Sequence, residues 1–260
     1  MQRGLAWGVF GAVAVVLASH LAAVAAVGEA SRPQVVERFL AGDKTARSYR
    51  ALRRLEARSE HREAWMDVWT EADASGFRYE VASQGGSGYI RSRVFTAALE
   101  AERKISATGT AHLAAITPDN YLFEDRGAGP SGLAWVGLMP RRKDLMLVQG
   151  SIFLRPEDGD LVRIQGTLAK PPSFWIRHVD IDRRYERIGG VRVPVSLQSV
   201  ARVLVAGKST FTVTYQYETV NGQHVGSPVP RPNSSVDGSD PVDSPQSEVV
   251  SSQLTVDSSH

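Results

Sequence analysis

The chain contains no cysteine. This absence excludes disulfide bonds, thiol nucleophiles and metal sites with cysteine ligands. It also excludes the acylated cysteine that anchors a bacterial lipoprotein to a membrane. The fold must therefore be held together by non-covalent packing alone.

Histidine is scarce, with six residues in 260, and the serine, aspartate and glycine residues that could belong to catalytic or phosphate-binding motifs do not complete such a motif. No two histidines have metal-ligand spacing, and H-E-x-x-H does not occur. The stretch 127–132 matches G-x-G-x-x-G, but it contains Pro130 and precedes an expected strand instead of a helix. Ser87 does not complete G-x-S-x-G, and Asp180 and Asp182 are spaced as on any charged strand face. We predict no catalytic residue, no metal, no cofactor and no enzymatic activity.

The first 30 residues have the composition of an export signal. Arg3 precedes an apolar run, 5–27, which ends in small residues such as Ala26. A retained membrane anchor is the alternative, because the run is nearly long enough to span a bilayer. No basic cluster follows it directly, so we favour cleavage and expect a soluble mature protein in the periplasm.

The last residues, 223–260, differ in composition from the rest. They are rich in serine, proline and aspartate, with one arginine and no aromatic residue. Such a segment buries too little apolar area to offset its ordering entropy, so we predict a disordered tail. In the remaining body, 31–222, the arginines are scattered without a dense run, which argues against nucleic-acid binding.

The body is long enough for one domain and alternates in the strand period over much of its length. Turn residues separate the alternating runs. Strands are expected at about 48–59, 62–70, 77–81, 121–124, 133–138 and 145–154, and in a further series through 150–217. Helical periodicity is confined to 33–40, where Ser31 is the expected cap, and 93–105.

This element order predicts an α+β fold built on one large antiparallel sheet. So many strands cannot remain flat, and twist curls them into an unclosed barrel. The two helices are expected to cover its concave face. The glycines at 85–88 precede the second helix and suggest a hinge on which that helix moves as a lid.

Several motifs in the strand region resemble bacterial outer-membrane lipoprotein-sorting (LolA/LolB-like) proteins, specifically the branch without a defined cargo. The resemblance covers about Val35 to Val220, and it is carried by the segments 150–153 (GSIF), 158–166 (DGDLVRIQG), 172–175 (PSFW), 191–194 (VRVP) and 207–217. It implies a strongly curved, unclosed β-barrel whose helices cover a hydrophobic cavity. It also implies a non-enzymatic, monomeric carrier of lipoprotein or other lipid acyl chains, which inner- and outer-membrane transfer proteins load and unload.

We accordingly predict a periplasmic carrier that moves acyl chains towards the outer membrane. The expected lipid-binding residues are the apolar side chains that we assign to the cavity, namely Leu55, Met66, Val68, Phe95, Leu99, Trp135, Phe153, Ile164, Phe211 and Val213. An envelope-stress sensor that binds lipoprotein and a protein partner is the main alternative. A scaffold with a filled core is a further one.

Overall fold

The structure is a computed structural model that describes residues 33–42, 45–172, 176–203 and 207–226. The expected signal, the Ser31 cap, most of the 172–175 motif and nearly all of the tail lie outside these ranges. In the described part, no helix is long and apolar enough to cross a membrane.

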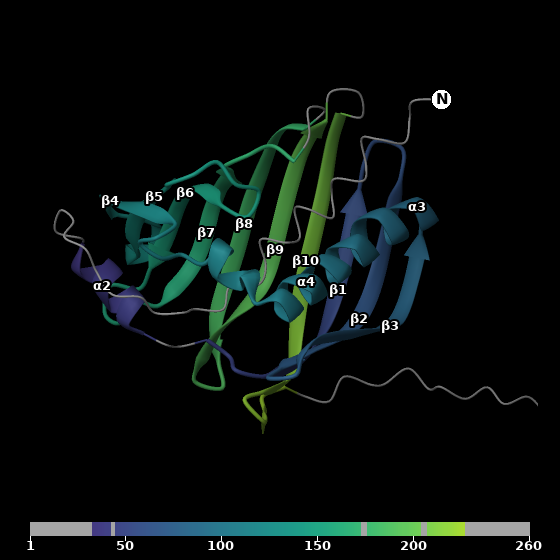
Figure 1. Ribbon diagram of the computed structural model, residues 1–260, viewed down its shortest axis with the longest axis horizontal. Coiled ribbons are helices and arrows are strands. Elements are labelled where there is room, and N and C mark those ends of the chain that lie inside the picture. Colours follow the sequence, from purple (N-terminus) through teal and green to yellow (C-terminus); the bar gives the residue numbers. More distant parts are fainter. Residues whose placement is uncertain (1–32, 43–44, 173–175, 204–206, 227–260) are drawn as a thin grey trace, which may run out of the picture. The chain divides into compact units, whose positions relative to one another are not determined.

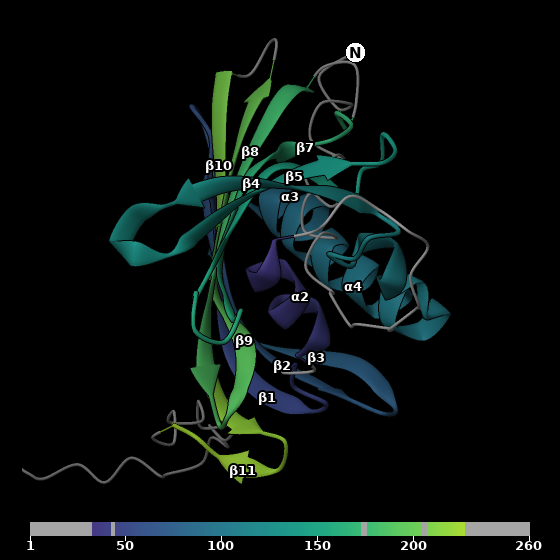
Figure 2. The ribbon, with the colours of Figure 1, turned by 90° about the vertical axis from the view of Figure 1, so that its left-hand side faces the viewer.

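Eleven antiparallel strands form one sheet, which the views from two sides show curving around the helices (Figures 1 and 2). The strands are β1 (Tyr49–Arg58), β2 (Glu63–Asp73), β3 (Gly76–Gly86), β4 (Tyr121–Ala128), β5 (Ala134–Pro140), β6 (Val148–Leu154), β7 (Leu161–Leu168), β8 (Ile176–Ile188), β9 (Val191–Val203), β10 (Gly207–Val220) and β11 (Gln223–His224).

The strand order is β3-β2-β1-β10-β9-β8-β7-β6-β5-β4, with β11 added to β10. Within the described strands β3 and β4 are the edges and do not pair with each other, so the sheet is not closed. Strand β11 lies just past the expected domain boundary at residue 222. The predicted fold class, an unclosed and strongly curved antiparallel sheet with helices on its concave face, is confirmed.

The helices lie against one face of the sheet. They are α2 (Gln34–Ala41), the consecutive segments α3 (Gly88–Ile90), π-helical η2 (Arg91–Thr96) and α4 (Ala97–Thr108), followed by the short 3₁₀ turn η3 (Thr110–Ala114). A further 3₁₀ turn, η4 (Pro130–Gly132), is exposed and joins β4 to β5. The core cluster includes buried side chains from α2, η2 and α4 together with those of the strands. The second predicted helix is therefore longer than expected and spans residues 88–108 without a break, so we call it the long helix.

Two boundaries differ from the sequence predictions for local reasons. Strand β6 begins at Val148 instead of residue 145, because Asp144 turns the chain by accepting hydrogen bonds from the backbone N–H groups of Met146 and Leu147. The glycines at 85–86 belong to β3. A Cβ atom on Gly86 would lie 2.4 Å from the carbonyl oxygen of Glu63, so this glycine allows a close approach of two strands.

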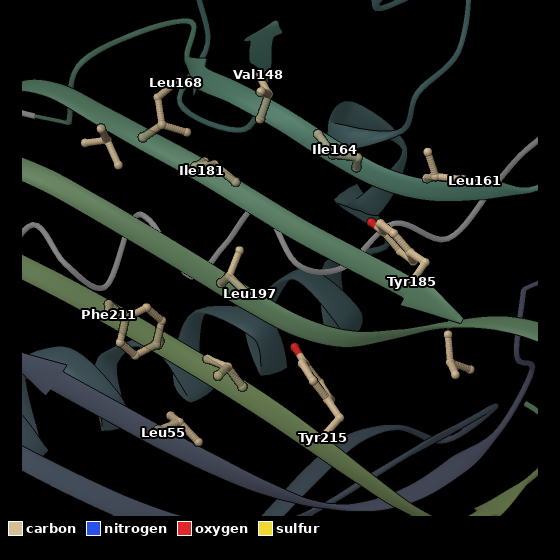
Figure 3. Packing of buried hydrophobic residues seen from close by; sticks show 14 of the residues in the cluster. Leu55, Val148, Leu161, Ile164, Leu168, Ile181, Tyr185, Leu197, Phe211 and Tyr215 are labelled. Atoms are coloured by element: carbon tan, nitrogen blue, oxygen red, sulfur yellow. The ribbon is translucent and has the colours of Figure 1, made fainter. Parts of the chain in front are cut away.

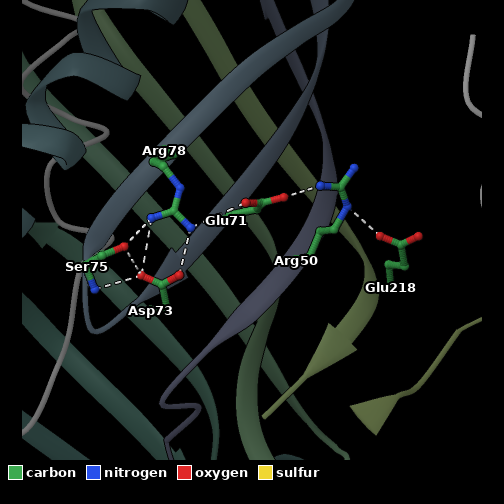
Figure 4. Close-up of polar contacts among 6 residues, drawn as sticks. All are labelled: Arg50, Glu71, Asp73, Ser75, Arg78 and Glu218. Carbon is green, nitrogen blue, oxygen red and sulfur yellow. Dashed lines mark hydrogen bonds and ion pairs between the residues drawn. The ribbon is translucent and has the colours of Figure 1, made fainter. Parts of the chain in front are cut away.

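The outer face of the β10–β1–β2–β3 region carries a chain of ion pairs (Figure 4). Arg50 contacts both Glu71 and Glu218. The guanidinium of Arg78 lies 3.4 Å from the carboxylate of Glu71 and 2.7 Å from that of Asp73. Hydrogen bonds from Arg78 and Ser75 hold the pKa of Asp73 well below its usual range. Exposed pairs contribute little to stability individually. Arg50 also covers the ring of Trp69, which is only 7% exposed although it faces outwards.

Strands β6 and β7 approach each other closely where Gly150 pairs with Gly166. A Cβ atom on Gly150 would lie 2.2 Å from the carbonyl oxygen of Gln165, so Gly150→Ala forces the strands apart. We expect a loss of about 1–3 kcal/mol in the free energy of unfolding, measured by urea denaturation.

Gly88→Ala is the matched control, because its Cβ would meet only the flexible end of Arg91 at 3.6 Å. Its stability should stay within about 0.5 kcal/mol of the parent protein. Equal midpoints for the two variants would show that the β6–β7 approach imposes no constraint.

Candidate functional site

A row of inward side chains, apolar at every position except Arg183, crosses the inner face of the sheet. Direct cross-strand pairs link one residue from each of eight neighbouring strands, in the order Met66, Leu55, Val213, Leu197, Arg183, Ile164, Ile152 and Val136. Directly paired residues share a face, so all eight point inwards. Figure 3 shows several of these side chains projecting from their strands to the same side. We call this set the inner row.

The structure brings eight of the ten predicted site residues together on this inner side. Leu55, Met66, Val213 and Ile164 belong to the inner row itself. Val68 is the next inward residue after Met66 on β2, and Phe211 is the inward residue before Val213 on β10. Both are fully buried. Phe95 and Leu99 come from the long helix and complete the group.

The long helix covers this part of the inner face. The rings of Phe95 and Phe211 lie 6.0 Å apart between their centroids, so helix and sheet are in direct aromatic contact. Phe95 and Leu99 are 0% and 1% exposed. The side chains of Phe95 and Leu99 therefore fill the space directly above this part of the inner face.

Trp135 and Phe153 lie on the outer face, apart from the other eight. Their rings stack at 6.5 Å, and the Trp135 Nε1–H donates to Ser151 Oγ at 2.7 Å. Their neighbours Val136 and Ile152 are the residues that point inwards. Strands β5 and β6 are apolar on both faces. Their composition therefore indicates that both faces are covered, but it does not indicate which set of alternate residues points towards the helices.

Sequence reasoning missed the charged pair beneath the long helix. Arg53 on β1 and Glu102 on α4 are 3% and 8% exposed. Two guanidinium nitrogens of Arg53 donate to the two carboxylate oxygens of Glu102, at 2.7 Å and 3.0 Å. A signal was present: Arg53 occupies an inward position in the alternation of Ala51, Leu55 and Ala57.

Aromatic rings surround the guanidinium group of Arg53. Its central carbon lies 4.9 Å from the ring centroid of Tyr215, 5.2 Å from that of Phe77 and 5.7 Å from that of Tyr49. The Tyr49 hydroxyl accepts a further hydrogen bond from it. Burial alone would lower the pKa of Arg53, but Glu102, Tyr49 and Tyr215 together outweigh this effect and the pKa is raised. The cation is therefore fully charged inside an aromatic pocket.

Helix α2 is seated by a second charged cluster at residues 155–160. Asp160 is 3% exposed and accepts hydrogen bonds from Arg187 at 2.8 Å and 3.1 Å, and Arg192 lies 3.5 Å from it. The guanidinium of Arg192 in turn stacks over Phe39 of α2, 5.1 Å from its ring centroid. A Cβ atom on Gly159 would lie 2.5 Å from the backbone nitrogen of Phe39, so loop and helix are in tight contact.

Three hollows are lined by described residues, and each lies away from the inner row. One of about 420 Å³ includes Trp65, Thr210 and Thr212, and another of about 500 Å³ includes Arg47 and Asn221. The third, about 270 Å³, is lined largely by outward polar side chains such as those on β7, β8 and β9. Among the described residues, no group of three or more histidine, aspartate or glutamate side chains is arranged to hold a metal ion.

A scan of the sequence against protein families gives no match, and neither does a search of curated proteins. Among the solved structures that align with this one are two with a TM-score of 0.34 each. A DUF1329 family protein from Desulfovibrio piger is 8% identical, over 70% of this chain and 88% of that one. A LolA superfamily protein from Nitrosomonas europaea is 9% identical, over 75% of this chain and 93% of that one.

Ionisation of the buried tyrosines should limit stability at high pH. Burial raises the pKa of Tyr79 and Tyr121 to about 12, and it raises the pKa of Tyr49, Tyr215 and Tyr217 as well. An unfolded tyrosine ionises at about pH 10. The stabilisation from these groups is therefore complete below pH 10 and is lost as the pH rises from 10 towards 12.

Urea midpoints measured across this pH range, with tyrosinate absorbance recorded in parallel, check the prediction. Tyr79→Phe should show a smaller loss of stability over the same interval, because one of the shifted phenols is gone. Ionisation of all tyrosines near pH 10 with unchanged stability would contradict it.

Proposed function

We propose that this protein is a non-enzymatic periplasmic carrier that binds the acyl chains of lipids or lipoproteins between the long helix and the inner row. The observation that carries the proposal is the inner row, apolar at every position except Arg183, whose part near β2 and β10 lies under the long helix. The family resemblance of the sequence motifs points to the same activity. In the closed conformation described above, the helix side chains occupy the place that an acyl chain would take.

The free energy gained by burying the helix side chains on the inner face is comparable to that gained by burying an acyl chain there. Burial of a large apolar side chain contributes roughly 1.5–3 kcal/mol, so the four helix side chains Ile90, Val94, Phe95 and Leu99 contribute roughly 6–12 kcal/mol. An acyl chain of about 15 methylene groups gains roughly 12 kcal/mol when it leaves water. An acyl chain can therefore replace the helix on the inner face without a large net cost.

The contacts of the long helix suit a movable cover. Its polar attachments to the sheet include the Arg53–Glu102 pair and the hydrogen bond from the Tyr79 hydroxyl to Glu100 at 2.6 Å. The π-helical segment 91–96 lies near its N-terminal end, where the backbone departs from regular α-helical hydrogen bonding. Ser87 and Gly88, which join it to β3, are the point about which it would turn.

Native mass spectrometry of the mature protein, purified from its own periplasm without detergent, tests the proposal directly. We expect a stoichiometric adduct that releases an acyl-bearing molecule on extraction. A clean apo mass that stays unchanged after addition of lipids and lipopeptides would refute the carrier function and favour a scaffold with a filled core.

Weakening the closed helix should favour acyl binding. Leu99→Ala removes a buried contact between helix and sheet, so the closed state loses stability and leaves space for a chain. The affinity for a fluorescent fatty acid should rise by about tenfold or more. Lys104→Ala, on the solvent side of the same helix, is the control and should leave the affinity unchanged.

Hydrogen exchange gives an independent measure of the cover. Residues 88–108 should exchange faster than β8, β9 and β10 in the absence of lipid, and their exchange should change on loading while that of the central strands stays constant. Equal protection of helix and sheet, with and without lipid, would show that the helix is not a lid.

A further inference from the structure

The Arg53–Glu102 pair has the geometry of a bound ligand. Both carboxylate oxygens of Glu102 face two N–H donors of one guanidinium group, at 2.7 Å and 3.0 Å. Arginine binds the carboxylate or phosphate group of a ligand in the same two-pronged manner. Because Glu102 belongs to the long helix, this carboxylate leaves the site whenever the helix moves.

Arg53 is held in position without the help of Glu102. It belongs to the central part of β1, where it pairs with Tyr215 on one side and Val68 on the other. The Tyr49 hydroxyl accepts a hydrogen bond from its Nη2 atom, and the rings of Tyr215 and Phe77 flank the guanidinium. These contacts all come from the sheet and stay in place when the helix is displaced.

A neutral cargo that takes the place of the helix leaves the charged guanidinium covered by apolar groups and without its carboxylate. Removing one partner of a buried ion pair is strongly unfavourable, because the remaining charge has lost water and counter-charge together. An anion supplied by the cargo would remove this penalty, whereas a neutral cargo would not. Nε of Arg53 is buried without a hydrogen-bond acceptor, so a further donor is available to an anion of more than two oxygens.

The position of Arg53 relative to the inner row fits an amphiphile. Arg53 and Leu55 are successive inward residues of β1, and Leu55 has Met66 on one side and the aliphatic side chains of Val213 and Leu197 on the other. A headgroup at Arg53 therefore places the attached acyl chain at the start of the row. A second buried arginine, Arg183, lies within the row itself.

We propose that Arg53, with the Tyr49 hydroxyl, is the binding site for the carboxylate or phosphate headgroup of an acyl cargo, and that Glu102 occupies this site while the helix is closed. The inference rests on the proposed carrier function and adds the chemical class of the cargo. Anionic amphiphiles open the helix by exchanging one anion for another on Arg53. Neutral amphiphiles must open it against an uncompensated charge.

Equilibrium binding of four single-chain amphiphiles tests the exchange. Oleate and lysophosphatidylglycerol carry a carboxylate and a phosphate, and oleyl alcohol and monooleoylglycerol carry no charged group. We expect the two anionic compounds to bind about tenfold or more tightly than the two others, the ratio that charge-assisted hydrogen bonds produce. Inorganic phosphate should not compete at equal concentration, because it lacks the acyl chain.

Glu102→Gln and Glu100→Gln form the matched pair of variants. Glu102→Gln removes the internal competitor, so it should raise the affinity for oleate and lysophosphatidylglycerol more than that for monooleoylglycerol. Glu100→Gln weakens a different contact of the same helix, the one with Tyr79, and should change all four affinities by the same factor. A uniform change in both variants would reduce Glu102 to a simple attachment point and overturn the inference.

Arg53→Met should abolish the preference for anionic amphiphiles. Because this change leaves Glu102 buried without its partner, the double variant Arg53→Met/Glu102→Gln is made as well, and it should lose the same preference. Thermal unfolding identifies which of the two is folded well enough to be assayed. Tight binding of all four amphiphiles without a preference would overturn the anion site and leave the carrier function standing. Failure of the parent protein to bind any of the four would overturn both.

Discussion

Covering a long apolar face is the physical requirement on which the rest of this structure depends. The sheet does not close, so its inner row has no opposite wall of strands and would be wet without the helices. Water contact over such an area is unfavourable in proportion to the apolar surface. The long helix and α2 provide the cover, and the close approaches of β6 to β7 and of loop 155–160 to α2 follow from bending the sheet around them.

The two helices meet this requirement in different ways. Helix α2 packs against a loop in which Asp160 is paired with arginines of β8 and β9, so its place is fixed by charge as well as by packing. The long helix relies on apolar contacts and one buried ion pair with the sheet. In the proposed carrier function, this difference makes the long helix the element that an acyl chain replaces, and Arg53 the residue at which the replacement is controlled.

A buried ion pair in an apolar face is poor evidence for stability, because desolvation offsets most of the Coulomb attraction. In the proposed exchange its value lies in discrimination, because the pair opposes replacement of the helix by a neutral amphiphile and permits replacement by an anion that binds Arg53 in place of Glu102. The outer-face network of Arg50, Glu71 and Arg78 has no such role, because exposed charges keep their hydration in every conformation.

The fold class follows from the sequence. The strands β1, β2 and β10 alternate with period 2, and one long stretch has helical periodicity, so a sheet covered by a helix is one of the few ways to bury their apolar faces. The sequence also identified eight residues that meet on the inner side, since strand parity fixes a common face for Leu55, Met66 and Val213. It did not assign Trp135 and Phe153 to the outer face, because their strands are apolar on both sides. The placement of Trp135 and Phe153 on the outer face became clear from the tertiary structure. The same holds for the pairing of Arg53 with Glu102, because 49 residues separate them and local sequence does not indicate which turn of a helix covers which strand.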